Sequence, residues 1–105
     1  MILTPENRIK EYTENGWWNS DTLYTLFLDA CEEAGNKEAL IDPPNRKEFT
    51  IGDSRRLTFN EVKKEVDKFS SKFFDLGFRK DDKVILQLPN IVELAILYIA
   101  LSKIG

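Results

Sequence analysis

The sequence of 105 residues contains no histidine and only one cysteine, Cys31. Without histidine and with a single thiol, the chain cannot build a Cys/His zinc site, a Ser-His or Cys-His nucleophile, or an internal disulfide. Glycine is also scarce, and the two nearest of the five glycines, Gly35 and Gly52, are seventeen positions apart. No glycine-rich loop can therefore cradle a phosphate. The sequence predicts no catalytic residue, no cofactor-binding residue and no metal ligand.

Excess positive charge and long apolar runs are missing as well. The 15 Lys and Arg residues are outnumbered by 18 Asp and Glu residues, which leaves a net charge of -3 and no cationic surplus for a nucleic-acid backbone. The longest apolar stretch, residues 94–101, is far shorter than the ~20 residues that span a bilayer. The first residues lack the basic segment and apolar run of a secretory signal. We therefore expect no nucleic-acid partner, no transmembrane segment and a cytoplasmic location, which suits one unpaired cysteine.

The composition of the chain is that of one globular domain, with 42% hydrophobic and 31% charged residues. Residues 6–14 are predicted to form a short charged helix that ends at Asn15 and Gly16, since glycine tolerates a positive φ. Trp17 and Trp18 follow this helix. They could form a ligand stack, but we favour packing, with one ring on the core and the other half-covering a helix.

A second helix is predicted between an N-cap at Ser20-Asp21 and a stop at Gly35. Cys31 lies beside the apolar face of this helix and is interpreted as a small core residue, because its neighbours are acidic and do not favour a thiolate. The apolar face itself is predicted to contain Leu23, Leu26, Phe27, Ala30 and Ala34.

Three short strands are predicted in the middle of the chain, over residues 38–42, 47–51 and 56–58. The prolines and asparagine at 43–45 break the first strand, and the turn at 52–54 separates the other two. A small antiparallel unit is the expected result.

The sequence Thr58-Phe59-Asn60-Glu61 matches a capping box, so a third helix should begin there and end before Gly77. Its apolar residues are spaced alternately three and four positions apart, which predicts a single buried stripe. The same spacing fits a coiled coil, but it lasts under three heptads, so we favour core packing. The stripe contains Phe59, Val62, Val66, Phe69, Phe73 and Leu76.

Residues 84–88, Val-Ile-Leu-Gln-Leu, do not alternate in polarity, as expected for a parallel strand that is covered on both faces. Pro89 ends this strand, and residues 90–93 resemble a cap that leads into a helix over 91–104. That helix is apolar almost all round, so it needs neighbours on most sides. The fold class predicted is α/β, with a small β unit, helices and the first parallel strand of a layered sheet, truncated at Gly105.

An ordered series of short motifs resembles the N-terminus of the AMP-forming adenylating enzymes, the acyl- and aryl-CoA synthetases and their aryl-acid-activating relatives. The resemblance covers about residues 8–105. It departs from the family where Phe59 replaces a common Tyr, where Asp81 replaces a common Gly, and in the longer segment 43–55. The motifs are Gly16-Trp17-Trp18, Thr22-Leu23, Glu38-Ala39-Leu40-Ile41-Asp42, Leu57-Thr58-Phe59-Asn60-Glu61-Val62, Leu76-Gly77-Phe78, Asp82-Lys83-Val84, Leu88-Pro89-Asn90, Glu93, Tyr98-Ile99-Ala100 and Ile104-Gly105.

The resemblance implies an acid-thiol ligase, of which this chain would be the N-terminal portion of the large AMP-binding domain. The Trp pair looks most like the branch with 2,3-dihydroxybenzoate-AMP ligases and fatty acid-CoA ligases. Such an enzyme activates a carboxylic acid with ATP and Mg to an acyl-adenylate and transfers the acyl group to CoA or a carrier thiol. The family's phosphate loop, nucleotide-binding Asp and catalytic Lys lie downstream of residue 105, so no functional residue is carried over and the 105-residue chain alone should be inactive.

The rival interpretation is a standalone interaction module that docks on a partner through its apolar last helix. In either case the strand at 84–88 and the helix at 91–104 expose apolar surface. We therefore expect the chain to self-associate through residues 84–104 unless the remainder of a parent chain covers that surface.

Overall fold

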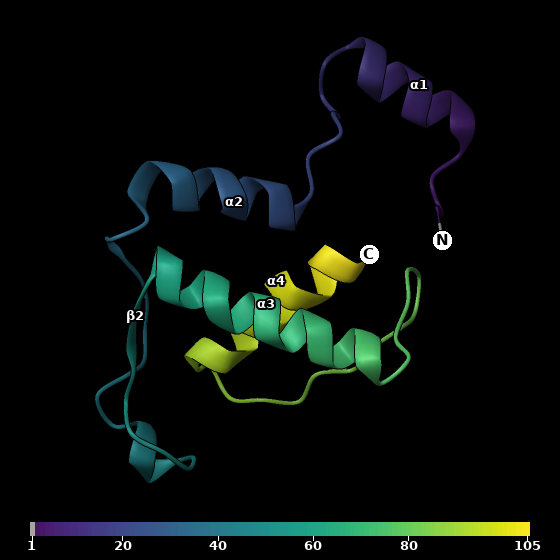
Figure 1. Ribbon diagram of the computed structural model, residues 1–105. Coiled ribbons are helices and arrows are strands. Elements are labelled where there is room, and N and C mark those ends of the chain that lie inside the picture. The colour runs from purple at the N-terminus through teal and green to yellow at the C-terminus, as the bar shows by residue number, and fades with distance from the viewer. Residues whose placement is uncertain (1) are drawn as a thin grey trace.

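The computed structural model describes residues 2–105, in which three helices pack together beside a small hairpin (Figure 1). Helices α3 and α4 lie side by side at the centre and run in roughly the same direction, because segment 84–88 returns the chain between them (Figure 1). α2 lies over both of these helices, and α1 stands apart from the rest. The mixed α/β class is therefore confirmed. In chain order the elements are α1 (Glu6–Glu14), α2 (Leu23–Ala34), β1 (Glu38–Ile41), the 3-10 helix η1 (Arg46–Glu48), β2 (Arg56–Thr58), α3 (Phe59–Asp75) and α4 (Val92–Ile104).

Helix α1 forms where the sequence predicts it and is followed by Gly16 at a φ of +70°. The helix buries none of its residues. The rings of Trp17 and Trp18 lie 5.7 and 5.0 Å from the ring of Tyr12, centroid to centroid. The expected packing of one tryptophan on the core is wrong, because both rings pack on their own segment and Trp17 remains 68% exposed.

The N-cap of helix α2 is Thr22, which directly follows the predicted cap at Ser20-Asp21. The Thr22 hydroxyl accepts from the N–H of Thr25, while the Thr25 hydroxyl accepts from the N–H of Thr22. Cys31 is buried, as predicted, and burial raises the pKa of its thiol. The apolar face is rotated from the predicted one, because Phe27 and Cys31 point into the core while Leu23 and Leu26 are half exposed.

The hairpin contains two of the three predicted strands. β1 and β2 pair antiparallel, with Glu38 opposite Thr58 and one irregularity in register before Leu40. The predicted strand at 47–51 is wrong, since its start lies within η1. A strand there would need a partner, whereas the turn allows the Arg46 side chain to point inward and bind two carboxylates.

Helix α3 starts with the predicted capping box. The Thr58 hydroxyl accepts from the N–H of Glu61, and the Glu61 carboxylate accepts from the N–H of Thr58 at 2.8 Å. Val62 and Val66 are fully buried in the middle of the predicted stripe. Gly77 follows the helix at a φ of +99°, where only glycine is unstrained.

Residues 84–88 run extended beneath α3 and α4 but do not form a strand. The predicted first parallel strand of a layered sheet is therefore not formed within residues 2–105, because no other strand lies beside this segment. Val84 and Leu86 are half-buried, whereas Ile85 is 94% exposed. The prediction that this segment is extended is confirmed, whereas the prediction that it is covered on both faces is wrong.

Helix α4 packs on α3 and α2. Ile96 and Ala100 are fully buried, and the Ser70 hydroxyl of α3 donates to the C=O of Ala100 at 3.0 Å. The expectation that this helix lacks neighbours is only half right, because most of its apolar side chains are at least half-buried and Tyr98 is the large one left outside. No helix in the part of the chain described has the length and apolarity needed to cross a membrane.

The capping box gives a first prediction. Thr58→Ala removes the hydroxyl that accepts the N–H of Glu61, and we expect it to lower the free energy of unfolding by ~1 kcal/mol. Glu61→Ala should give a smaller loss, and Glu61→Gln, which keeps an oxygen acceptor, a smaller one still. Urea melts of the three variants measure the effect. Unchanged midpoints would show that α3 is not stabilised by this cap.

Candidate functional site

The structure places two charged side chains in the interior, at the junction of the hairpin with α4. Asp42 follows β1 and is 4% exposed, and Arg46 begins η1 and is 5% exposed. Buried ionised groups are costly unless they are paired, and groups with perturbed pKa values often mark functional sites. This junction is therefore the candidate site of the chain.

The Asp42 carboxylate accepts three hydrogen bonds. Its Oδ1 accepts from the N–H of Val92 at 2.9 Å, which caps the N-terminus of α4. Its Oδ2 accepts from the N–H of Arg55 at 2.9 Å and from Nη1 of Arg46 at 2.6 Å. The predicted local cap at 90–93 is therefore wrong, because the acceptor comes from a residue 50 positions away.

The Arg46 guanidinium joins this carboxylate to that of Glu93 in the first turn of α4. Nη1 and Nη2 of Arg46 donate to the two oxygens of Glu93 at 2.9 and 2.8 Å, and Nε donates to the C=O of Ile51 at 3.2 Å. Planar two-point contacts of this kind are specific to arginine. Arg55 extends the junction, with Nη1 at 3.6 Å from Glu93 and Nη2 at 3.9 Å from Glu65 of α3.

The pKa directions follow from these contacts. Burial alone would raise the pKa of Asp42, but hydrogen bonds from Val92, Arg46 and Arg55 outweigh it and hold the pKa below its ordinary value. Burial also acts to raise the pKa of Glu93, but the hydrogen bonds from Arg46 outweigh it, and the pKa is lowered. Both carboxylates are therefore ionised at neutral pH. These paired charges join the hairpin to the start of α4, and the Asp42–Arg46–Glu93 junction is called the joint below.

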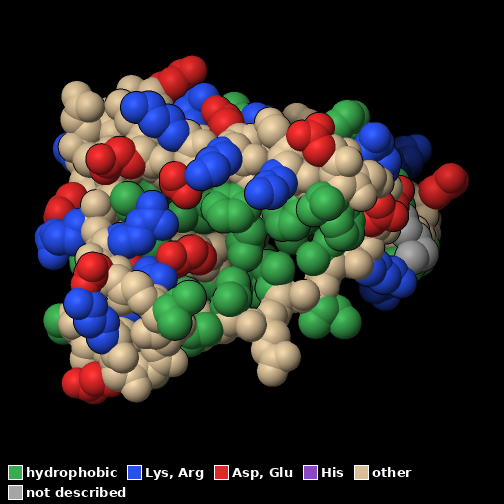
Figure 2. Space-filling model, turned by 60° about the horizontal axis from the view of Figure 1, so that its bottom comes forward, with side chains coloured by type: hydrophobic (Ala, Val, Ile, Leu, Met, Phe, Trp, Pro, Cys, Tyr) green, Lys and Arg blue, Asp and Glu red, His purple; other side chains and the backbone are tan. Residues whose placement is uncertain are grey.

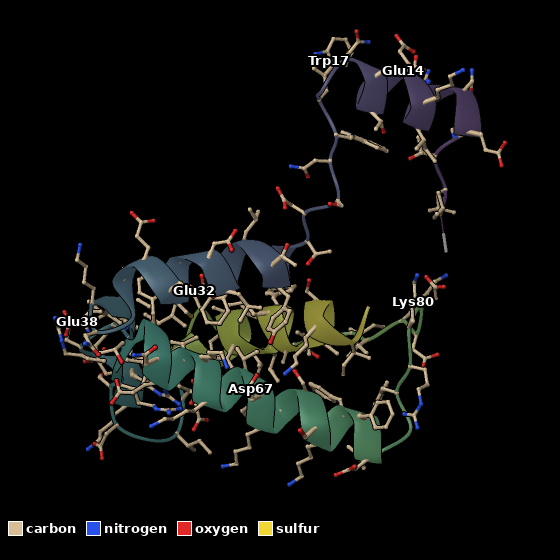
Figure 3. The ribbon with its side chains drawn as sticks, turned by 45° about the horizontal axis from the view of Figure 1, so that its top comes forward. Glu14, Trp17, Glu32, Glu38, Asp67 and Lys80 are labelled. Carbon is tan, nitrogen blue, oxygen red and sulfur yellow. The ribbon has the colours of Figure 1, made fainter. Side chains whose placement is uncertain are left out.

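A second charged cluster connects α3 with α4. The two oxygens of Asp67 accept from Nζ of Lys63 at 3.0 Å and from Nζ of Lys103 at 2.8 Å. Figure 3 shows Asp67 between these helices, whereas Glu14, Glu32 and Glu38 project from other parts of the chain. These acidic side chains do not converge on one point.

The described residues do not fit the ATP and Mg that the resemblance implies. Residues 2–105 contain no group of three acidic or cysteine side chains that could hold a metal. One of the hollows with both charged and apolar walls has a volume of about 330 Å³ and lies between the 78–86 segment and the end of α4. Its two charged side chains, Arg79 and Asp82, belong to the turn after α3. We derive no catalytic step from it.

The junction was missed by sequence reasoning. The sequence pattern makes Asp42 the end of a strand, puts Arg46 just before a strand that does not form, and puts Glu93 in a local cap. The one signal available was an acidic residue at the end of a predicted strand followed by two prolines, which cannot donate backbone hydrogen bonds to it. The partner of that acid depends on the tertiary fold.

Comparison with known proteins gives a consistent result. A family model described as "AMP-binding enzyme" matches residues 27–105. Triostin synthetase I from Streptomyces triostinicus is 29% identical over the whole chain, and an acetyl-coenzyme A synthetase from Streptomyces coelicolor is 35% identical over 85% of it. A 2,3-dihydroxybenzoate-AMP ligase from Bacillus subtilis is 28% identical over 96% of it. The chain spans 18%, 14% and 17% of these three relatives.

The two arginines that clasp glutamates offer a matched test of the joint. Arg46→Lys should lower the urea midpoint clearly, because an ammonium cannot bridge Asp42 and Glu93 in the plane that the guanidinium uses. Arg56→Lys is the control, since Arg56 makes a similar two-point contact with Glu38 on the exposed face of the hairpin. Its midpoint should change little. Equal effects of the two substitutions would contradict a special role for the buried contact.

The lowered pKa values give a pH dependence with a defined sign. Because Asp42 and Glu93 titrate lower in the folded than in the unfolded chain, their contribution is complete above about pH 4–5 and is lost as the pH falls through the folded values. At neutral pH the free energy of unfolding of Asp42→Asn should therefore be about 3 kcal/mol lower than that of the unsubstituted chain. This difference in stability should become smaller in acid. Urea melts from neutral pH to about pH 3 measure it. A stability difference that does not change with pH would contradict the prediction.

Proposed function

Because the chain belongs to the AMP-binding enzyme family, we propose that it is the N-terminal portion of the large domain of an AMP-forming acid-thiol ligase. The observation that carries the proposal is the family match, which begins in α2 and continues to residue 105. The relatives support the reaction class, since their names describe acetyl-coenzyme A synthetases and aryl-acid-AMP ligases. The complete ligase would use ATP and Mg to activate a carboxylic acid and would transfer the acyl group to CoA or a carrier thiol.

The part played by this chain in such a ligase is structural. The Asp42–Arg46–Glu93 joint fixes the hairpin to the start of α4, and the α2–α3–α4 layer gives a rigid support. The extended segment 84–88 lies on this layer with its outer side open. The remainder of the ligase would add its strands there and would supply the residues that bind the nucleotide and the acid. We place the ligase in the cytoplasm, where ATP and CoA are available.

The open side of segment 84–88 also supports a second proposal, that the 105-residue chain self-associates through residues 84–104. The exposed apolar residues in that range are Ile85, Leu88 and Tyr98. Covering side chains of this size is worth roughly 1.5–3 kcal/mol each. In the complete ligase the same surface would be covered by its own chain.

The ligase proposal predicts a difference between the 105-residue chain and its continuation in the same reading frame. The purified chain should show neither ATP binding by calorimetry nor acid-dependent pyrophosphate exchange, because its described residues provide no phosphate cradle. The continued chain should show exchange with one of a panel of aryl and aliphatic acids. Micromolar ATP affinity of the short chain, or a continued chain with no exchange for any acid, would overturn the proposal.

Self-association predicts a mass that rises with concentration in light scattering. Tyr98→Glu should shift the chain toward the monomer, because Tyr98 is 55% exposed and its replacement leaves the core intact. Phe74→Glu on α3 is the matched control, since Phe74 is equally exposed but lies outside residues 84–104. A mass equal to that of the monomer at every concentration would contradict the proposal.

A further inference from the structure

The backbone of residues 83–88 has no hydrogen-bond partner within the described chain. None of its six N–H groups donates to, and none of its six C=O groups accepts from, another residue between 2 and 105. Native proteins pair nearly all backbone polar groups with protein or with water. An extended run of unpaired groups is a template for a further strand.

The side chains of this segment alternate as they do at the edge of a sheet. Val84 and Leu86 are half-buried toward the helices, while Ile85 and Gln87 point away from them and are exposed. Figure 2, which brings the lower face of the molecule forward, shows apolar side chains gathered in the middle of this face and charged ones around them. The open hollow beside Val84 and Leu86 also has Tyr98 in its wall.

The sequence of the segment permits an antiparallel pairing with a second copy of itself. Lys83 precedes its apolar part, and Pro89, which has no N–H, ends it, so the uncharged strand is residues 84–88 with Leu86 at its midpoint. A two-fold axis at Leu86 places Ile85 opposite Gln87 of the second copy and Val84 opposite Leu88. No like charges then face each other. The same patch serves both copies, which is the geometry of a closed dimer.

We propose that two copies of the chain associate by antiparallel pairing of residues 84–88 about Leu86. This inference rests on the self-association proposed above and specifies its contact. The pairing satisfies alternate backbone groups of both copies and places the two exposed Ile85 side chains on one face of the new ribbon. Stacking of the two α4 helices alone would cover Tyr98 but would leave the backbone of 83–88 unpaired.

A charge exchange at two exposed positions tests the register. The double variant Ile85→Lys with Gln87→Lys places like charges directly opposite each other twice in the dimer, so its dissociation constant should rise by about tenfold. The double variant Ile85→Lys with Gln87→Glu places opposite charges at the same points and should keep the dimer. Both variants change only exposed side chains, so the monomer should fold alike in each, which urea melts can check.

Amide hydrogen exchange gives a second measurement on the unsubstituted chain. In the dimer alternate amides of residues 84–88 should exchange more slowly, by about tenfold or more, than in the dilute monomer. Sedimentation velocity at the same concentrations establishes the state of the chain. A chain that stays monomeric overturns both this inference and self-association. Dimers whose 84–88 amides remain unprotected, or whose two double variants dissociate equally, overturn the strand pairing alone. None of these outcomes bears on the ligase activity of the continued chain.

Discussion

The buried carboxylate of Asp42 is the contact on which the arrangement of the chain depends. It accepts hydrogen bonds from the start of α4, from η1 and from the residue before β2, so three segments meet at one pair of oxygens. A buried acceptor that loses its donors costs more than the hydrogen bonds themselves contribute. The hairpin and the helical layer are therefore held in one orientation by charge as well as by the apolar packing of Leu57, Ala39 and Leu40 on the core.

The helices of this layer are well packed against one another, whereas the side of the layer that carries segment 84–88 is open. Val62, Val66, Ile96 and Ala100 are fully buried between the helices, and the Ser70 hydroxyl crosses from α3 to the backbone of α4. On the other side segment 84–88 lies with its outer edge bare. This difference suits a chain that spans less than a fifth of its curated relatives. It also locates the surface where a ligase would continue.

Features that depend on neighbouring residues could be predicted from the sequence, whereas the joint could not. The cap of α3 is formed by Thr58 and Glu61, three positions apart, and the buried stripe needs only the helical repeat. The role of Arg46 depends on Glu93, 47 positions away, and no local pattern encodes that distance. Segment 84–88 was predicted as a strand from its composition, but a strand also requires a partner. The expectation of no catalytic residue rests on composition and motifs and stays a prediction, whereas the joint is visible only in the fold.

The separation of Asp42 from Val92 also has a consequence for the order in which the chain folds. Contacts between distant residues form late, because the intervening chain must first be closed into a loop. α2 and α3 have capping boxes made within their own segments and can begin as soon as they are synthesised. α4 receives its cap only when the hairpin has already brought Asp42 into position. Of the four α-helices described, therefore, α4 is synthesised last and becomes fixed last, and its docking brings Glu93 into contact with Arg46 in the same step.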